Sequence, residues 1–222
     1  MRLYTVQPLK VYDSLVEGHP YEARPREAPD SPLNDVRNNG WLKAYDWLRV
    51  QRATKGIAPA QDPAVYPVWA WCQWGGPRRR KPDLRTQSLR RWAAKDRHVL
   101  LTLEVPDALV QLSDCDAWHW CLNYWFLGRP REVQRFEKAY AALNLSYYKQ
   151  KPLPDRGLGA RLRASWQGIF DLSRARCLLE TRKRDQIVQA AFWRIEPGQV
   201  TAAVEFGRGT KATTRYDLEP KG

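Results

Sequence analysis

The sequence predicts an α+β fold, in which a mixed β-sheet is flanked by helices. Segments with the alternation typical of strands lie early, in the middle and late in the chain, at residues 2–6, 65–74, 99–105, 187–195 and 200–206. The 222 residues, of which 43% are hydrophobic, are enough to bury a substantial core. We therefore expect one domain over residues 1–206, followed by a polar C-terminal tail over residues 207–222.

Helices are predicted where apolar residues recur at helical spacing, at residues 9–17, 34–55, 114–126, 132–143 and 158–170. Glycine ends the first two, because Gly18 and Gly56 follow their last apolar positions. Ser113 precedes the third helix and is its predicted N-cap. Residues 19–33 and 75–97 are polar or rich in proline and are predicted as loops, the second with a short helix as the alternative.

The charge balance favours an anionic partner. Lysine and arginine number 37 against 24 acidic residues, which gives a formal net charge of +13 and a pI near 9.8. Such a field attracts nucleic acid, acidic lipid or acidic protein. A genome rich in G and C would explain an excess of arginine over lysine, but it explains the net charge poorly.

Cysteine usage and the N-terminal segment indicate the compartment. The four cysteines form no CxxC pair, and no group of histidine and cysteine has zinc spacing, so we expect no structural metal. The chain opens MRLYTVQPLKVY without an apolar signal region, and no stretch approaches the ~20 apolar residues of a membrane span. These features predict a cytoplasmic protein with reduced thiols and no membrane partner.

The segment over residues 65–85 combines aromatic rings with cations. It contains Trp69, Trp71 and Trp74, turns at Gly75-Gly76-Pro77, and continues into four cations, Arg78, Arg79, Arg80 and Lys81. Flat apolar rings beside guanidinium groups can hold a ligand that is both flat and anionic, such as a nucleotide or a polynucleotide. The alternative is that the tryptophans belong to the core and the cations to a solvated loop.

Two short constellations have acid–base or hydrogen-bonding chemistry. Asp116, His119 and Asn123 are three and four residues apart, so they share one face of the predicted helix over 114–126. Asp116 would orient His119 for proton transfer or for phosphate contact. In the predicted strand over 187–195, Gln189 shares a face with Trp193 and would bind an amide or a hydroxyl group. As alternatives, the histidine belongs to a buried polar network and the glutamine is a surface residue.

The first predicted strand is a third constellation. Tyr4 and Thr5 would present a hydroxyl group and a backbone edge to a ligand at the end of this strand. The alternative, a plain first strand, is favoured when this segment is taken alone.

Several blocks, taken in order, resemble a bacterial family defined as domain of unknown function 3841. They are LYTVQP, YPVWAWCQW, KPDLR, LTLEVPD, LSDCDAWHWCLNYW, YKQKPLP, SWQGIFDL and VQAAFWRI. The resemblance extends over residues 1 to about 200. It implies membership of a family without bringing an activity.

A more distant resemblance implies a function. The opening strand, helix and glycine, with Tyr4 and Thr5 on the strand, look like the start of ADP-ribosyltransferase-type domains, and VQAAFW is similar to the strand on which their DNA-modifying members place a catalytic glutamate. This resemblance implies a split mixed sheet that binds NAD as co-substrate. The residues it assigns to NAD binding are Tyr4, Thr5, Gln7, Trp69, Trp71, Gln73 and Arg85, with Gln189 at the ribose.

The chain departs from that pattern where the glutamate is expected. It has Gln189 and Ala191 there, and Glu196 and Glu205 would replace the carboxylate only in a different register. Three hypotheses therefore stay open. The first is an NAD-dependent ADP-ribosyltransferase acting on RNA or DNA, with a toxin or defence role and an antitoxin partner. The second is a non-catalytic module that binds nucleic acid or nucleotides. The third is a structural protein whose tryptophans form its core.

Overall fold

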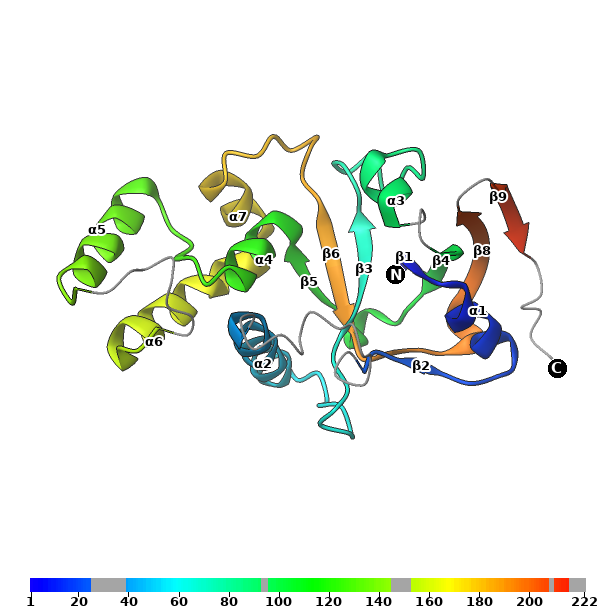
Figure 1. Ribbon diagram of the computed structural model, residues 1–222, viewed down its shortest axis with the longest axis horizontal. Coiled ribbons are helices and arrows are strands. Elements are labelled where there is room, and N and C mark those ends of the chain that lie inside the picture. Colours follow the sequence, from blue (N-terminus) through cyan, green and yellow to red (C-terminus); the bar gives the residue numbers. More distant parts are fainter. Residues whose placement is uncertain (25–38, 93–95, 145–152, 208–209, 216–222) are drawn as a thin grey trace.

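The structure, a computed structural model, describes residues 1–24, 39–92, 96–144, 153–207 and 210–215 (Figure 1). Its strands are β1 (Arg2–Pro8), β2 (Tyr21–Glu22), β3 (Val68–Gln73), β4 (His98–Glu104), β5 (Gln111–Asp114), β6 (Val188–Phe192), β7 (Arg194–Ile195), β8 (Val200–Gly207) and β9 (Thr210–Arg215). Seven of them form one sheet in the order β5-β6-β3-β1-β4-β8-β9, and β2 pairs with β7. The α+β class is confirmed. The expected mixed sheet is not observed, because each strand pair in the described residues is antiparallel.

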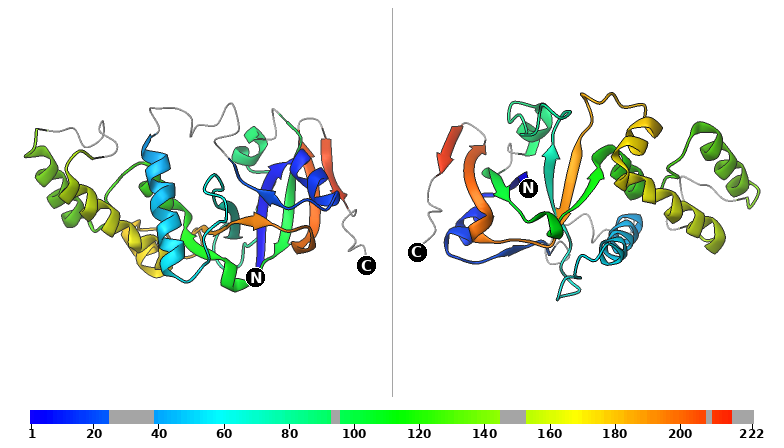
Figure 2. Two further views of the ribbon diagram at one scale, coloured as in Figure 1. Left: turned by 90° about the horizontal axis from the view of Figure 1, so that it is seen from below. Right: turned by 180° about the vertical axis from the view of Figure 1, so that it is seen from behind.

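The helices lie mainly at one end of the sheet. They are α1 (Leu9–Val16), α2 (Asn39–Thr54), α3 (Gln87–Trp92), α4 (Cys115–Leu122), α5 (Pro130–Ala141), α6 (Arg156–Ser165) and α7 (Leu172–Leu178). Figure 1 shows α2 and α4–α7 gathered beyond the β5 end, with β8 and β9 at the opposite end, and Figure 2 shows the same separation from below and from behind. Among the helices in the described part of the chain, none has the length and hydrophobicity needed to span a membrane.

Strand alternation gives the sheet two apolar faces. Leu3, Val68 and Leu101 point to one face, where α1 covers them with Val11, Tyr12 and Leu15. Tyr4, Leu100 and Phe206 point to the other face, where Leu89 of α3 packs on them. A third and larger core lies among the helices around the fully buried Trp166, whose indole N–H donates to the carbonyl of Trp125 at 2.9 Å.

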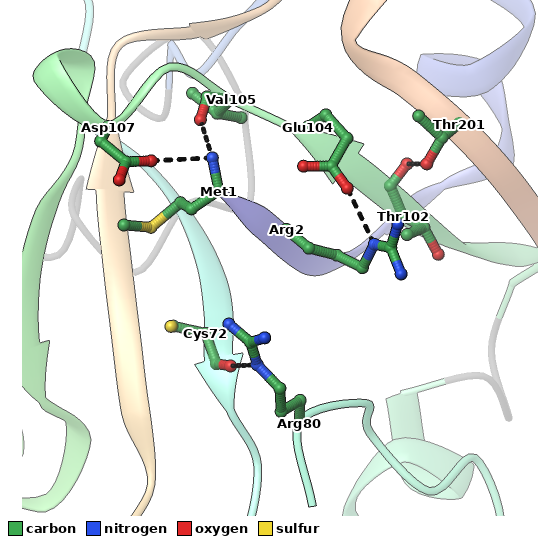
Figure 3. A network of polar contacts seen from close by, with 9 residues as sticks. All are labelled: Met1, Arg2, Cys72, Arg80, Thr102, Glu104, Val105, Asp107 and Thr201. Carbon is green, nitrogen blue, oxygen red and sulfur yellow. Dashed lines mark hydrogen bonds and ion pairs between the residues drawn. The ribbon is translucent and has the colours of Figure 1, made fainter. Parts of the chain in front are cut away.

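The pairing of β1 with β4 is the longest continuous register in the sheet, from Arg2 opposite Glu104 to Pro8 opposite His98. The first of these pairs also carries an ion pair, in which Arg2 Nε lies 2.8 Å from Glu104 Oε1 (Figure 3). Both side chains are largely exposed, so this pair adds little stability. This ladder joins two strands near the middle of the sheet order.

Helix α4 begins one residue later than the sequence predicts. Asp114, rather than Ser113, is its N-cap, and the Asp114 carboxylate accepts a hydrogen bond from the backbone N–H of Ala117 at 3.0 Å. Ser113 belongs to β5 instead, opposite Gln189 of β6. Serine and aspartate are nearly equal as N-caps, so the sequence alone could not choose between two adjacent positions.

The C-terminal segment also differs from its prediction. Residues 210–215 form β9 and pair with β8, so the expected domain boundary at residue 206 falls inside a β-hairpin. Of the other predicted segments, residues 25–38 of the first predicted loop and of the second predicted helix lie outside the described residues.

Candidate ligand-binding cavity

The sheet opens between β1 and β3. These two strands share a single register pair, Tyr4 opposite Trp71. Continuing that register would set Pro8 against Pro67, and neither proline has an N–H to donate. The hydroxyl group of Thr5 donates to the carbonyl of Trp69 at 2.8 Å in place of a ladder bond. Beyond the Tyr4–Trp71 pair, the described residues of the two strands share no further register pair, and the Thr5 side chain links them instead.

A cavity of about 580 Å³ lies at this opening, and we call it the aromatic cavity. Segments from β1, β2, β3, β6 and helices α2, α3 and α4 form its lining. The lining residues are Thr5, Val6, Gln7, Tyr21, Ala23, Tyr45, Pro67, Val68, Trp69, Ala70, Trp71, Trp74, Ser88, Leu89, Cys115, Asp116, Trp118, His119, Leu122, Ile187 and Gln189. The volume is within the range of small-molecule and cofactor sites, roughly 300–1,000 Å³.

The walls of the aromatic cavity consist of two groups of rings. In one group, the rings of Trp69 and Trp118 lie 5.1 Å apart, and Tyr45 meets both edge-on while its hydroxyl accepts a hydrogen bond from the Trp69 indole at 3.2 Å. In the other group, Trp71 and Trp74 form a T-shaped pair with centroids 4.9 Å apart. Trp69, Trp71 and Trp74 are all half-buried, so part of each residue remains exposed to solvent. The cavity can therefore hold a flat ring.

Helix α4 supplies the acid–base groups of the cavity. The ring Nδ1 of His119 lies 2.8 Å from the carbonyl of Cys115, which can only accept, so Nδ1 carries the proton and a neutral His119 keeps Nε2 free as a base. The sequence assigned this orienting role to Asp116. The structure gives it to the backbone of Cys115, while the Asn123 side chain donates to the His119 carbonyl at 2.8 Å.

Asp116 is the one carboxylate among the described lining residues, and this lining contains no lysine or arginine. Partial burial and the nearby Asp114 carboxylate raise the pKa of Asp116, and His119 opposes that shift. The same environment acts on Cys115, where burial, then Asp116 and Asp114, raise the thiol pKa to about 12. The local field is therefore negative, which suits a neutral or cationic ring.

Amide and hydroxyl groups form the polar part of the cavity wall. Gln189 is buried on β6, and its side-chain nitrogen donates to the Ser113 hydroxyl at 3.2 Å. Gln7 donates to the Thr5 hydroxyl at 2.8 Å. These bonds fix the side chains before any ligand arrives, which limits the entropy lost on binding.

Three other residues that the sequence predicts to bind NAD lie outside the aromatic cavity. Tyr4 is buried beneath α3 with Leu89. Gln73 donates to the carbonyl of Gln186 at 2.8 Å. Arg85 is exposed and forms a bidentate pair with Asp83, with contacts of 2.9 Å and 2.8 Å. The structure thus brings together Thr5, Gln7, Trp69, Trp71, Asp116, His119 and Gln189, out of the ten ligand and catalytic residues that the sequence suggested.

The cations after β3 do not line the aromatic cavity. Arg78 and Arg79 line a separate concavity, Arg80 turns back so that its Nε lies 3.5 Å from the Cys72 carbonyl (Figure 3), and Lys81 is exposed. The expectation of guanidinium groups directly around the indoles is therefore wrong for this cavity.

The two alternative carboxylates are also elsewhere. Glu196 pairs with Arg194 at 2.5 Å, and the buried Glu205 pairs with Arg97. Neither residue lines the aromatic cavity. The carboxylate of the cavity comes from α4 and not from a late strand.

Sequence reasoning missed several lining residues, chiefly Tyr21, Tyr45, Cys115 and Trp118. Tyr45 and Trp118 have the apolar spacing of core helices, and most of their area is indeed packed in the helical core. Tyr45 and Trp118 also line the aromatic cavity because they contact Trp69, and a local sequence pattern does not reveal such a tertiary contact.

The fold and the cavity define an α+β protein with an aromatic-lined cavity between two strands of an antiparallel sheet. The sequence model of the domain of unknown function DUF3841 matches residues 2–201, so the chain belongs to this family. No curated protein and no solved structure matches the chain significantly.

Proposed function

We propose that this chain binds NAD in the aromatic cavity and transfers its ADP-ribose to a nucleic acid. One observation carries the proposal, namely that half-buried indoles, the Asp116 carboxylate and the His119 imidazole line the same cavity beside β1 and β3. The nicotinamide of NAD is a flat ring with a positive charge. Tryptophan faces and a single carboxylate attract such a ring, and a cavity lining without lysine or arginine does not repel it.

The proposed reaction breaks the bond between the nicotinamide nitrogen and the ribose C1′. Both electrons of that bond leave with nicotinamide, which becomes neutral, and the ribose acquires positive charge. The Asp116 carboxylate stabilises this charge electrostatically. A nitrogen or oxygen of the acceptor then bonds to C1′, and its proton passes to Nε2 of His119, which the Cys115 carbonyl keeps free.

Gln189 has a positioning role in this scheme, because an amide cannot take a proton at neutral pH. Its place on β6, with its nitrogen held by Ser113, suits contact with ribose hydroxyls. The carboxylate that ADP-ribosyltransferase-type domains have on this strand is replaced in our proposal by Asp116. An ADP-ribosyltransferase-like arrangement of the sheet is part of the same proposal.

The test is incubation with NAD labelled in its adenylate part, with single-stranded RNA or DNA as acceptor. We expect nicotinamide release and transfer of the label to the nucleic acid. Asp116→Asn should lower the rate at least about tenfold, as expected when one electrostatic contact to the transition state is lost. Asp46→Asn is the matched control, because Asp46 is an exposed carboxylate of α2 outside the cavity. No nicotinamide release with any acceptor would refute the proposal.

A second candidate function is nucleic-acid binding without turnover. The absence of a glutamate at Gln189 and Ala191 favours it, and so do the cations that follow β3. Affinity that falls linearly with the logarithm of salt concentration and does not respond to NAD would support it. A role as a toxin or defence effector, with an antitoxin partner, depends on the first candidate and is tested by the genes that adjoin this one.

A further inference from the structure

Two basic segments that are far apart in the sequence meet on one surface. They form a concavity of about 650 Å³ lined by Gly75, Gly76, Pro77, Arg78, Arg79, Lys183, Arg184 and Asp185. We call it the basic concavity. Its two sides are the loop that follows β3 and the loop that precedes β6, which Figure 1 shows next to each other at one end of the paired strands.

Backbone contacts hold these two loops together. The N–H of Gly76 donates to the carbonyl of Gln186 at 2.9 Å, and the Gln73 side chain donates to the same carbonyl at 2.8 Å. Gly76 has a φ of +73°, and a Cβ at this position would lie 2.5 Å from the carbonyl oxygen of Arg184. The close approach therefore requires glycine, and the basic concavity is a built feature of the fold.

The first loop is also closed on itself. The N–H groups of Trp74 and Gly75 both donate to the carbonyl of Arg79, at 2.8 Å and 3.0 Å. The backbone that carries Arg78 and Arg79 is thereby fixed, while their side chains remain exposed to solvent. A fixed backbone with exposed cations is suited to binding a chain of phosphates.

The charges of the basic concavity are largely unbalanced. Four cations line it, and Asp185 is the one carboxylate in the lining. Among the residues that the structure describes, the ion pairs of these cations are limited to Arg184 with Asp185, at 3.8 Å and largely exposed. An anionic partner would therefore meet little competition from acidic side chains.

The basic concavity adjoins the aromatic cavity. Trp74 lines the aromatic cavity and the next residue, Gly75, lines the basic concavity. On the other side, Asp185 lines the basic concavity and Ile187 lines the aromatic cavity. The two cavities are therefore neighbours along both loops, with the four cations on one side and Trp74 on the other.

We propose that the basic concavity seats the phosphates of a single-stranded nucleic acid and delivers one of its nucleotides to the mouth of the aromatic cavity. Arg78, Arg79, Lys183 and Arg184 contact the phosphates in this arrangement. The strand is single because a base inside a duplex cannot reach the cavity without leaving its stack. The inference rests on the proposed function only in making this strand the acceptor, since strand binding itself needs no NAD.

The test is fluorescence anisotropy with labelled oligonucleotides of about 12 nucleotides, a length within the usual site size of single-strand binders. Single-stranded RNA, single-stranded DNA and a duplex are compared without NAD and over a range of salt. We expect both single strands to bind more tightly than the duplex, and the tighter of the two identifies the natural acceptor. Lys183→Gln/Arg184→Gln should weaken binding at least about tenfold and flatten the salt slope by roughly 0.7 for each lost contact.

Arg131→Gln/Arg135→Gln is the matched control, because it removes the same charge from exposed positions of α5. We expect it to bind as the wild type does, and thermal melts confirm that both double variants fold. Equal losses in the two double variants, or tighter binding of the duplex, would overturn the inference. Single-strand binding as described, together with no nicotinamide release, would support this inference and refute the proposed function.

Discussion

Tyr4 and Trp71 form the one register pair that joins β1 to β3, and the aromatic cavity opens directly beyond it. The pair sits at the centre of a seven-stranded sheet, where a strand normally bonds along its length. In the continued register Pro8 would face Pro67, and neither residue has an N–H to donate. The site is therefore located by the chemistry of the backbone as much as by the side chains that line it.

Trp74 and Trp166 illustrate two different roles of tryptophan, one in the wall of the aromatic cavity and one in the helical core. Trp74 is half-buried at the cavity, whereas Trp166 is fully buried among the helices. We expect Trp74→Ala to remain folded and to lose about 1–3 kcal/mol of nucleotide-binding free energy, the usual value of one stacking ring. Trp166→Ala should lose about 3–5 kcal/mol of unfolding free energy. Isothermal titration with NAD and urea denaturation measure the two effects. Wild-type affinity in Trp74→Ala would contradict the account.

Asp116 makes stability depend on pH in a defined direction. Its pKa is raised above the ordinary value of 3.8 in the folded chain, chiefly because neighbouring groups displace water from the carboxylate, although the residue as a whole is exposed. The folded state therefore keeps the Asp116 proton up to a higher pH than the unfolded state does. As pH rises from the unfolded pKa through the raised folded pKa, the contribution of Asp116 to the unfolding free energy falls. Asp116→Asn removes the titration, so the variant should be more stable than the wild type at neutral pH.

Urea titrations at several pH values check this prediction. The two proteins should converge at about pH 3, where Asp116 is protonated in both the folded and the unfolded states. A variant that is less stable than the wild type at neutral pH would show that the Asp116 carboxylate is stabilised in the folded chain, contrary to the raised pKa.

Cys115 should be unreactive although it lines the cavity. With a thiol pKa of about 12, only about one molecule in 10⁴ carries the thiolate at pH 8. We expect iodoacetamide to modify the exposed Cys177 first and Cys115 far more slowly, as read by mass spectrometry of the peptides. Asp116→Asn should accelerate the alkylation of Cys115, because the Asp116 charge contributes to the raised pKa of the Cys115 thiol. Equal rates at the two thiols in the wild type would refute the prediction.

Gly76 should be essential for the basic concavity. An alanine there would have to keep a φ of +73° and would place Cβ 2.5 Å from the Arg184 carbonyl oxygen. We expect Gly76→Ala to lower the unfolding free energy by at least about 1–2 kcal/mol and to weaken single-strand binding. Gly198→Ala is the control, since nothing lies within 4 Å of its added Cβ, and its effect should stay within about 0.5 kcal/mol. Gly76→Ala with the stability of the wild type would contradict the close loop packing.

The spacing of apolar residues, together with the glycine and proline residues that end segments, predicted the order of most helices and strands. The helix before Gly18, the strand of tryptophans and the strand after His98 follow from local patterns that tertiary contacts then reinforce. Among the missed strands, β2 has two residues and β5 has four, the last of which is the N-cap of α4. The six-residue β9 was missed because its segment, TKATTR, is polar and lacks apolar alternation. Strand direction was missed for a different reason, since pairing depends on the whole topology and not on local sequence.

The site was predicted in its parts but not in its assembly. Trp69, Trp71, Asp116, His119 and Gln189 carry distinctive local signals, and the structure gathers them around one cavity. The prediction that the cations after β3 surround the indoles was wrong, because a run of charged residues does not specify where its side chains point. Their true neighbours, Lys183 and Arg184, come from a loop more than a hundred residues away and could be found only from the pairing of β3 with β6.

The most direct test of the central claim is a crystal structure of the wild-type protein with NAD. Our account predicts the nicotinamide ring between the indoles of Trp69, Trp71 and Trp74, with the ribose C1′ facing the Asp116 carboxylate. NAD bound at another surface, or an aromatic cavity that stays empty at saturating NAD, would contradict it.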